Sequence, residues 1–110
     1  MSSVAKLVLL DETITASKDG SGFSLQNYQI DFVGIIKITS YVAGTFVGKI
    51  QHSVDGIDWF DLLTFSSLTS ATQELKFPTT NVLGHVRAIV TASSTPNAHI
   101  FIALNYRTSK

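Results

Sequence analysis

Apolar and polar residues alternate along most of this chain, with a repeat of two residues instead of three or four. From Ala98 to Tyr106, large apolar residues occupy nearly every second position. Because successive side chains of a β-strand point to opposite faces, this pattern predicts a strand with one continuous apolar face. Gly84–Ala92 alternates in the same way, and Ser93–Asn97 between the two segments is rich in turn-forming residues. The sequence therefore predicts a C-terminal hairpin.

Two further hairpins are predicted end to end in the middle of the chain. The first joins Ile35–Val42 to Thr45–Val54 through Ala43-Gly44, and the second joins Thr45–Val54 to Ile57–Phe65 through Asp55-Gly56. An Asp-Gly pair is a strong hairpin signal because it tolerates the positive φ angles of a two-residue turn. Weaker alternation predicts strands over residues 4–10, 28–33 and 72–77, with a flexible loop over 18–22.

About eight strands and little or no helix predict an all-β fold, an antiparallel β-sandwich that is jelly-roll-like or a small closed barrel. At 110 residues we expect one domain over 1–110. Residues 1–28 are then either an extended N-terminal arm that pairs with a neighbouring subunit or an edge strand of the chain's own sheet.

Charge and composition exclude several classes of partner. Eight basic and eight acidic residues cancel, so no basic field is available for nucleic acid. The chain has no cysteine, and the apolar run before Asp11 is too short for a signal peptide or a membrane span. Charged residues make up only 15%, against about a quarter in most proteins. Such a charge-poor surface favours faces that are covered by neighbours.

No motif predicts an enzyme, a cofactor site or a metal site. Gly22-Phe23-Ser24 lacks the glycine that ends a nucleophile elbow, and Gly20-Ser21-Gly22 lacks the third glycine of a phosphate-binding loop. The remaining candidates for metal ligands are scattered histidines and turn aspartates, for which surface roles are expected: His52, His85, His99, Asp55, Asp58 and Asp61.

Four apolar residues are predicted to contact a partner. Trp59 and Phe60 are adjacent, so on a strand one of them points inward and the other outward. One interpretation makes Trp59 an anchor of the core. The other is that whichever aromatic points outward contacts a partner or a sugar ring. Ile89 and Phe101 fall on the otherwise polar faces of their predicted strands. The pair Ile35-Ile36 likewise places one isoleucine on each face.

The stretch Gly48–Leu62 contains Ser53-Val54-Asp55-Gly56-Ile57-Asp58-Trp59, which resembles a recurring strand, Ser-x-Asp-Gly-x-x-Trp, strand pattern. The pattern is similar to a hairpin of discoidin-like carbohydrate- and lipid-binding sandwiches. It also resembles the small β-sandwich virion proteins of tailed bacteriophages, found as capsid decoration (cement) proteins and as neck or tail components. The length, the lack of cysteine and the charge-poor composition resemble the second group.

The resemblance implies a structural virion protein, foremost a capsid decoration protein that binds the major capsid protein or other virion proteins. It implies self-association, location in the virion and no catalytic activity. The alternatives are a neck or tail component and a small carbohydrate-binding module that uses exposed aromatics such as Trp59, Phe60, Tyr41 or Tyr28.

Overall fold

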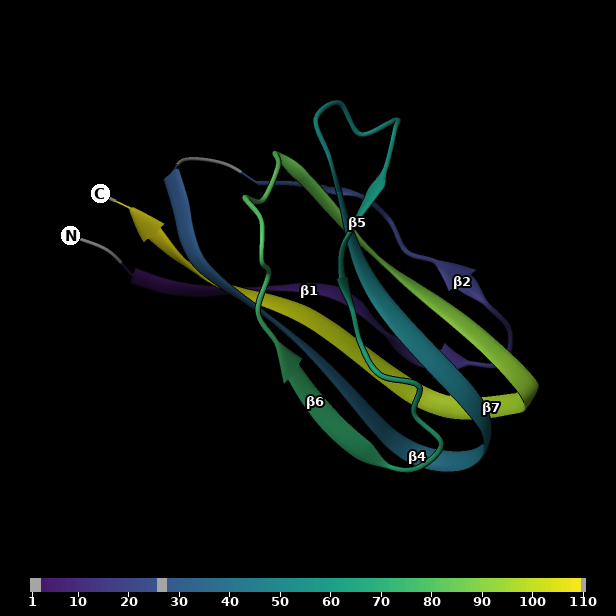
Figure 1. Cartoon of the computed structure of the whole chain (residues 1–110). Coiled ribbons are helices and arrows are strands. Elements are labelled where there is room, and N and C mark those ends of the chain that lie inside the picture. The colour runs from purple at the N-terminus through teal and green to yellow at the C-terminus, as the bar shows by residue number, and fades with distance from the viewer. Residues whose placement is uncertain (1–2, 26–27, 110) are drawn as a thin grey trace.

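The computed structural model describes residues 3–25 and 28–109 of the chain, and all regular elements in these residues are β-strands. Within this part of the chain there is no helix that could cross a membrane. Two strands are much longer than the others (Figure 1). In chain order the strands are β1 (Ser3–Ile14), β2 (Lys18–Asp19), β3 (Phe23–Ser24), β4 (Tyr28–Ser53), β5 (Phe60–Thr64), β6 (Thr72–Lys76) and β7 (His85–Ser109).

The long strands β4 and β7 run antiparallel to each other along nearly their whole length, from Tyr28 opposite Ser109 to Ser53 opposite His85. Both bend sharply in the middle, so this ribbon folds over and forms two layers (Figure 1). One layer, the β1–β6 sheet, holds β1, the C-terminal half of β7, the N-terminal half of β4, and β6. The other, the β2–β5 sheet, holds β2 and β3, the N-terminal half of β7, the C-terminal half of β4, and β5. Two four-stranded antiparallel layers of this kind make a jelly-roll sandwich, as predicted.

The bend lies where the β4–β7 register is interrupted, between Thr39 and Thr45 of β4. In β4, Ser40 and Gly44 have φ angles of 48° and 107°, and in β7, Ser94 and Thr95 have φ angles of 63° and 51°. A Cβ atom on Gly44 would lie 2.6 Å from the Cα atom of Pro96, so the two corners also pack closely. Positive φ angles turn both strands from one sheet into the other.

Two of the predicted hairpins are therefore wrong. Ala43-Gly44 and Ser93–Asn97 do change the direction of the chain, but each makes a corner between the two sheets and not a reversal within one sheet. The segments on either side of each corner pair with the other long strand and not with each other. The predicted hairpin through Asp55-Gly56 is confirmed in outline, since β4 pairs with β5. Its connection spans residues 54–59, which is longer than the predicted two-residue turn.

The N-terminal segment pairs within its own chain. β1 pairs with β7 from Ser3 opposite Thr108 to Ile14 opposite Ala98. The segment predicted as a flexible loop contains β2, and the Ser17 hydroxyl accepts a hydrogen bond from the backbone N–H of Ala92 at 2.9 Å. Segments of residues 3–24 thus pair along β7.

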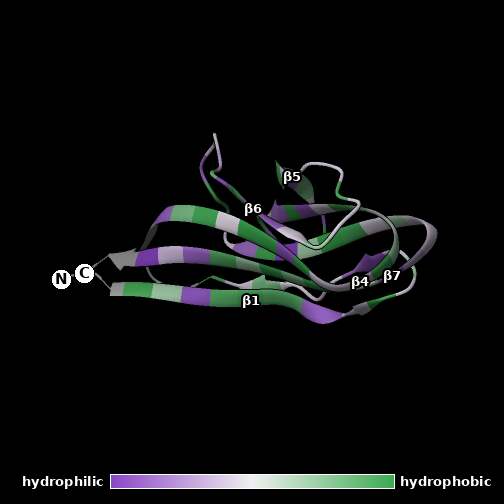
Figure 2. Cartoon of the chain, turned by 90° about the horizontal axis from the view of Figure 1, so that it is seen from below, coloured by the Kyte–Doolittle hydropathy of each residue, from purple (hydrophilic) through white to green (hydrophobic). Residues whose placement is uncertain are grey.

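One hydrophobic core fills the space between the sheets, and the hydropathy of the long strands alternates from residue to residue (Figure 2). Glycines bring the layers close together: a Cβ atom on Gly48 of the β2–β5 sheet would lie 2.6 Å from Cδ1 of Ile36 in the β1–β6 sheet. The largest fully buried apolar side chains come from both layers: Phe46, Phe65, Ile14, Ile36, Ile38, Ile50, Ile100, Ile102 and Leu104.

Candidate interaction surfaces

The outer face of the β1–β6 sheet carries an apolar row that crosses all four strands. Val8 of β1 is the register partner of Ala103, Ala103 is the partner of Ile35, and Ile35 is the partner of Leu75 in β6. Register partners share a face, so these four side chains lie on one line across the sheet. Leu75 is 62% exposed at the outer end of the row. The outer face of an antiparallel sheet is ordinarily polar, so an apolar row of this length marks a surface for contact.

A groove of about 270 Å³ lies on this face, and we call it the lysine groove. Two cations flank its aromatic residue: the Nζ atoms of Lys6 and Lys37 each lie 5.9 Å from the centre of the Phe101 ring. The two lysines come from β1 and β4, the strands on either side of β7. The groove is lined by Lys6, Val33, Ile35, Lys37, Leu75, Phe101, Ala103 and Asn105.

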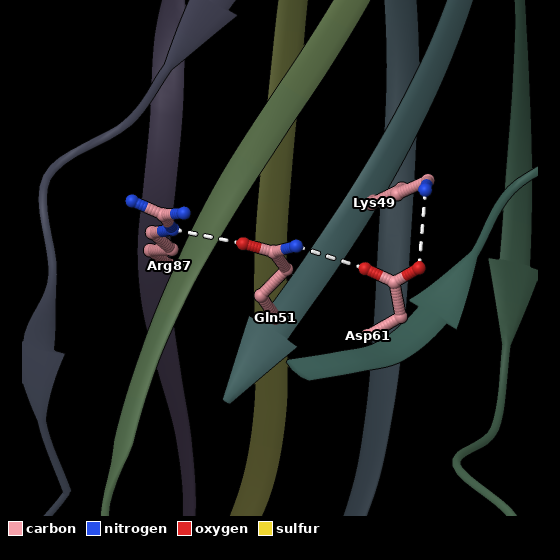
Figure 3. Close-up of polar contacts among 4 residues, drawn as sticks. All are labelled: Lys49, Gln51, Asp61 and Arg87. Atoms are coloured by element: carbon pink, nitrogen blue, oxygen red, sulfur yellow. Dashed lines mark hydrogen bonds and ion pairs between the residues drawn. The ribbon is translucent and has the colours of Figure 1, made fainter. Parts of the chain in front are cut away.

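The outer face of the β2–β5 sheet carries a chain of polar contacts instead (Figure 3). Arg87 Nε donates to Gln51 Oε1 at 2.9 Å, and Gln51 Nε2 donates to Asp61 Oδ1 at 2.8 Å. Lys49 Nζ donates to the other oxygen of Asp61 at 3.0 Å. The hydrogen bonds from Gln51 and Lys49 lower the pKa of Asp61. On this face Lys49 and Asp61 form an ion pair, and Arg87 is hydrogen-bonded to Gln51.

Trp59 extends this polar chain at its Arg87 end. The guanidinium carbon of Arg87 lies 4.6 Å from the centre of the Trp59 ring, within the range of a cation–π contact. A Cβ atom on Gly22 would lie 3.1 Å from Cζ2 of the same ring. Trp59 is half-buried and lies outside the hydrophobic core, so it is not the core anchor that the sequence allowed.

The loop between β4 and β5 is held by its own side chains. The buried Ser53 hydroxyl accepts hydrogen bonds from the backbone N–H groups of Asp55 and Gly56, at 3.2 and 2.8 Å, and donates to Asp55 Oδ1. Asp55 Oδ1 also accepts from the N–H groups of Ile57 and Asp58. These bonds, those from Ile57 and Asp58 first, lower the pKa of Asp55. The Ser-x-Asp-Gly motif thus forms a loop whose carboxylate is already engaged.

The four predicted contact residues lie in different places. Phe101 lines the lysine groove on the β1–β6 sheet. Ile89 and Trp59 belong to the β2–β5 side, where Ile89 is the register partner of Lys49. Phe60 begins β5 next to the β4–β5 loop and is 59% exposed. The structure therefore divides them between the two faces and one end of the sandwich.

Six of the eight residues that line the groove were not singled out from the sequence, among them Lys6, Lys37 and Leu75. Ile35, which the sequence analysis named, is the register partner of Leu75. The alternation of the strand over residues 72–77 could therefore have identified Leu75 as an apolar residue on the same face. Lysines on strands ordinarily indicate a solvated face or a protected edge. Their convergence on Phe101 depends on the strand order β1–β7–β4, which the local pattern does not encode.

Two of the three histidines, His52 and His99, make polar contacts within the fold. His52 is buried, its Nδ1 atom accepts a hydrogen bond from the backbone N–H of Leu83 at 3.2 Å, and burial lowers its pKa. His99 Nε2 contacts the Asp11 carboxylate. Within residues 3–25 and 28–109, no three side chains of the ligating types gather to hold a metal ion.

Known structures share this fold at low sequence identity. A structure of the Gx strain of infectious bursal disease virus matches over 98% of this chain and 33% of that chain, with a TM-score of 0.55 and 12% identity. T=1 particles derived from infectious bursal virus match over 97% and 32%, with a TM-score of 0.58 and 12% identity. A crystal structure of PirA matches over 96% and 92%, with a TM-score of 0.51 and 12% identity. No protein-family model and no curated protein matches the sequence.

This chain spans about a third of the virus chains that it matches and nearly all of PirA. At 12% identity these matches establish a shared jelly-roll fold.

Proposed function

We propose that this protein is a structural, non-catalytic component of a virus particle, and specifically a decoration protein that binds the shell of a tailed bacteriophage and bridges its subunits. The observation that carries the proposal is the apolar row with the adjoining lysine groove on the outer face of the β1–β6 sheet. An apolar surface that crosses a whole sheet suits a protein that works while covered by a neighbour.

Two further observations support the proposal. The fold is shared with chains of a virus and of virus-derived particles. The β4–β5 hairpin holds the Ser-Val-Asp-Gly turn by which the sequence resembles small virion sandwiches of tailed phages. A decoration protein binds a repeating surface in many copies, so a modest contact area on an 11.9 kDa chain is sufficient when symmetry multiplies it.

The proposal is tested by quantitative mass spectrometry of gradient-purified particles from the source of this sequence. We expect the chain in the particles at a copy number comparable to that of the major shell protein. Purified protein should also rebind, with saturation, to particles from which it has been removed. Absence of the chain from the particles would overturn a virion role. A copy number far below that of the shell subunits would overturn the decoration role in favour of a neck or tail component.

A further inference from the structure

The lysine groove combines apolar walls with two lysines that form no ion pair within the part of the chain that the structure describes. Lys18, Lys49 and Arg107 each form an ion pair with an acid of their own chain. Among residues 3–25 and 28–109, Lys6 and Lys37 form no ion pair within 4 Å. Asp11, the acid opposite Phe101 in the sheet, contacts His99. Two free ammonium groups therefore border a predominantly apolar recess.

The size of the recess limits what can occupy it. Small-molecule sites usually enclose roughly 300–1,000 Å³. The lysine groove has about 270 Å³ and is open to the surface, so it accommodates one or two side chains better than a cofactor. Ala103 is fully buried, so the apolar surface that the groove offers comes from the larger side chains of Ile35, Leu75 and Phe101. An apolar side chain of a partner would contact these three residues.

The charges indicate what lies next to that side chain. Each lysine Nζ is 5.9 Å from the centre of the Phe101 ring, so a group that sits over Phe101 lies between two positive charges. A carboxylate of the partner would pair with both ammonium groups where the walls exclude water. Such charge complementarity sets the register and partner choice of an interface.

A second copy of this chain does not fit with its own groove against this one. Two grooves placed face to face would bring two copies each of Lys6 and Lys37 together, and no acid lines the groove to compensate them. Like charges at an interface cost several kcal/mol. The occupant is therefore a different surface, one that carries negative charge.

We infer that the lysine groove binds a short segment of another virion protein in which an apolar side chain is followed closely by Asp or Glu. This inference rests on the proposed function and specifies the contact through which the protein is held on the particle. The apolar side chain packs against Ile35, Leu75 and Phe101, and the carboxylate lies between Lys6 and Lys37.

The test measures binding of purified variants to particles that lack the protein, by co-sedimentation over a range of concentrations. The charge variant is Lys37→Glu, and its control is Lys76→Glu, an exposed lysine of β6 that does not line the groove. The apolar variant is Leu75→Asp, and its control is Val42→Asp, which changes an equally exposed residue at the corner of β4. Thermal unfolding of each variant establishes that it is folded.

We expect Lys37→Glu and Leu75→Asp each to weaken binding about tenfold or more, since each removes a desolvated contact of about 1.5 kcal/mol or more. Both controls should bind within about twofold of the wild type, and Lys37→Arg should retain binding. Groove variants that bind like the wild type would overturn the groove inference while leaving the virion role intact. Failure of the wild type itself to bind would count against the proposed function. Concentration-dependent self-association abolished by the same variants would identify a second copy as the occupant and overturn the inference.

Discussion

The Arg87 guanidinium carbon lies 4.6 Å from the centre of the Trp59 ring, and Trp59 is the only tryptophan of the chain. This pair joins the β4–β5 loop to β7 and continues the polar contacts through Gln51 to Asp61. Trp59, one of the four aromatic residues considered for sugar binding, is thus partly covered by a cation. The apolar groove lies on the opposite sheet, around Phe101.

Replacing Arg87 with Met should change the environment of Trp59. We expect a red shift of the fluorescence emission, because the ring loses the cover of the guanidinium and gains contact with water. A double-mutant cycle of Arg87→Met with Trp59→Leu, followed by urea unfolding, should give a coupling energy of about 0.5–1 kcal/mol. Arg107→Met, which changes an arginine paired with Asp31, is the control and should leave the emission unchanged. A coupling energy of zero would contradict the contact.

Ser53→Ala should destabilise the fold by about 1–3 kcal/mol, since it removes a buried hydroxyl and leaves the N–H groups of Asp55 and Gly56 without that acceptor. The free energy of unfolding in urea measures the loss. Ser21→Ala, at an exposed position, should change stability by less than about 0.5 kcal/mol. Equal effects of the two substitutions would show that the Ser-x-Asp-Gly loop does not contribute to stability.

Gly48→Val should cost about 1–3 kcal/mol or more, because a side chain at this position meets Ile36 across the core and forces the two layers apart. Gly34→Val should behave in the same way, since its side chain would meet Leu63 and Ile50. Gly84→Val is the matched control, because no atom lies within 4 Å of the added Cβ. Urea unfolding of the three variants gives the comparison. If the control lost as much stability as the other two, close packing across the core would not explain the effect.

Stability should decrease as the pH falls below about 6.5 because of His52. Burial lowers the pKa of this imidazole in the folded state, so the unfolded chain binds the proton more readily. The contribution is therefore complete above the unfolded value of 6.5 and is lost as the pH falls through the lower folded value. Protonation would also remove the acceptor for the Leu83 N–H.

Urea unfolding between pH 7.5 and 5 tests this expectation with two variants. His52→Gln should flatten the pH dependence over that interval, whereas His85→Gln, which keeps His52, should retain it. If His52→Gln kept the slope of the wild type, another group would be responsible.

The sequence pattern predicted the candidate surface only in part. Alternation alone places Phe101 and Ile35 on the polar side of their strands, so two residues of the groove were recognisable as unusual. Lys6 and Leu75 are far apart in the chain, and they reach the same groove only because β1, β7, β4 and β6 lie side by side in that order. No local pattern encodes that order.

By itself, the sequence determined the all-β class, the positions of most strands and the two corners. Period-two alternation needs no partner to be recognised, and residues such as Gly44 and Ser94 indicate where the backbone adopts positive φ angles. Only the tertiary structure decided that these corners connect two sheets instead of closing two hairpins. The same positive φ angles serve either geometry, and the choice depends on whether β4 pairs with itself or with the distant β7. That pairing buries one apolar face of each long strand in a single core. Because the paired segments are far apart in the chain, the local sequence pattern does not predict the contact between them.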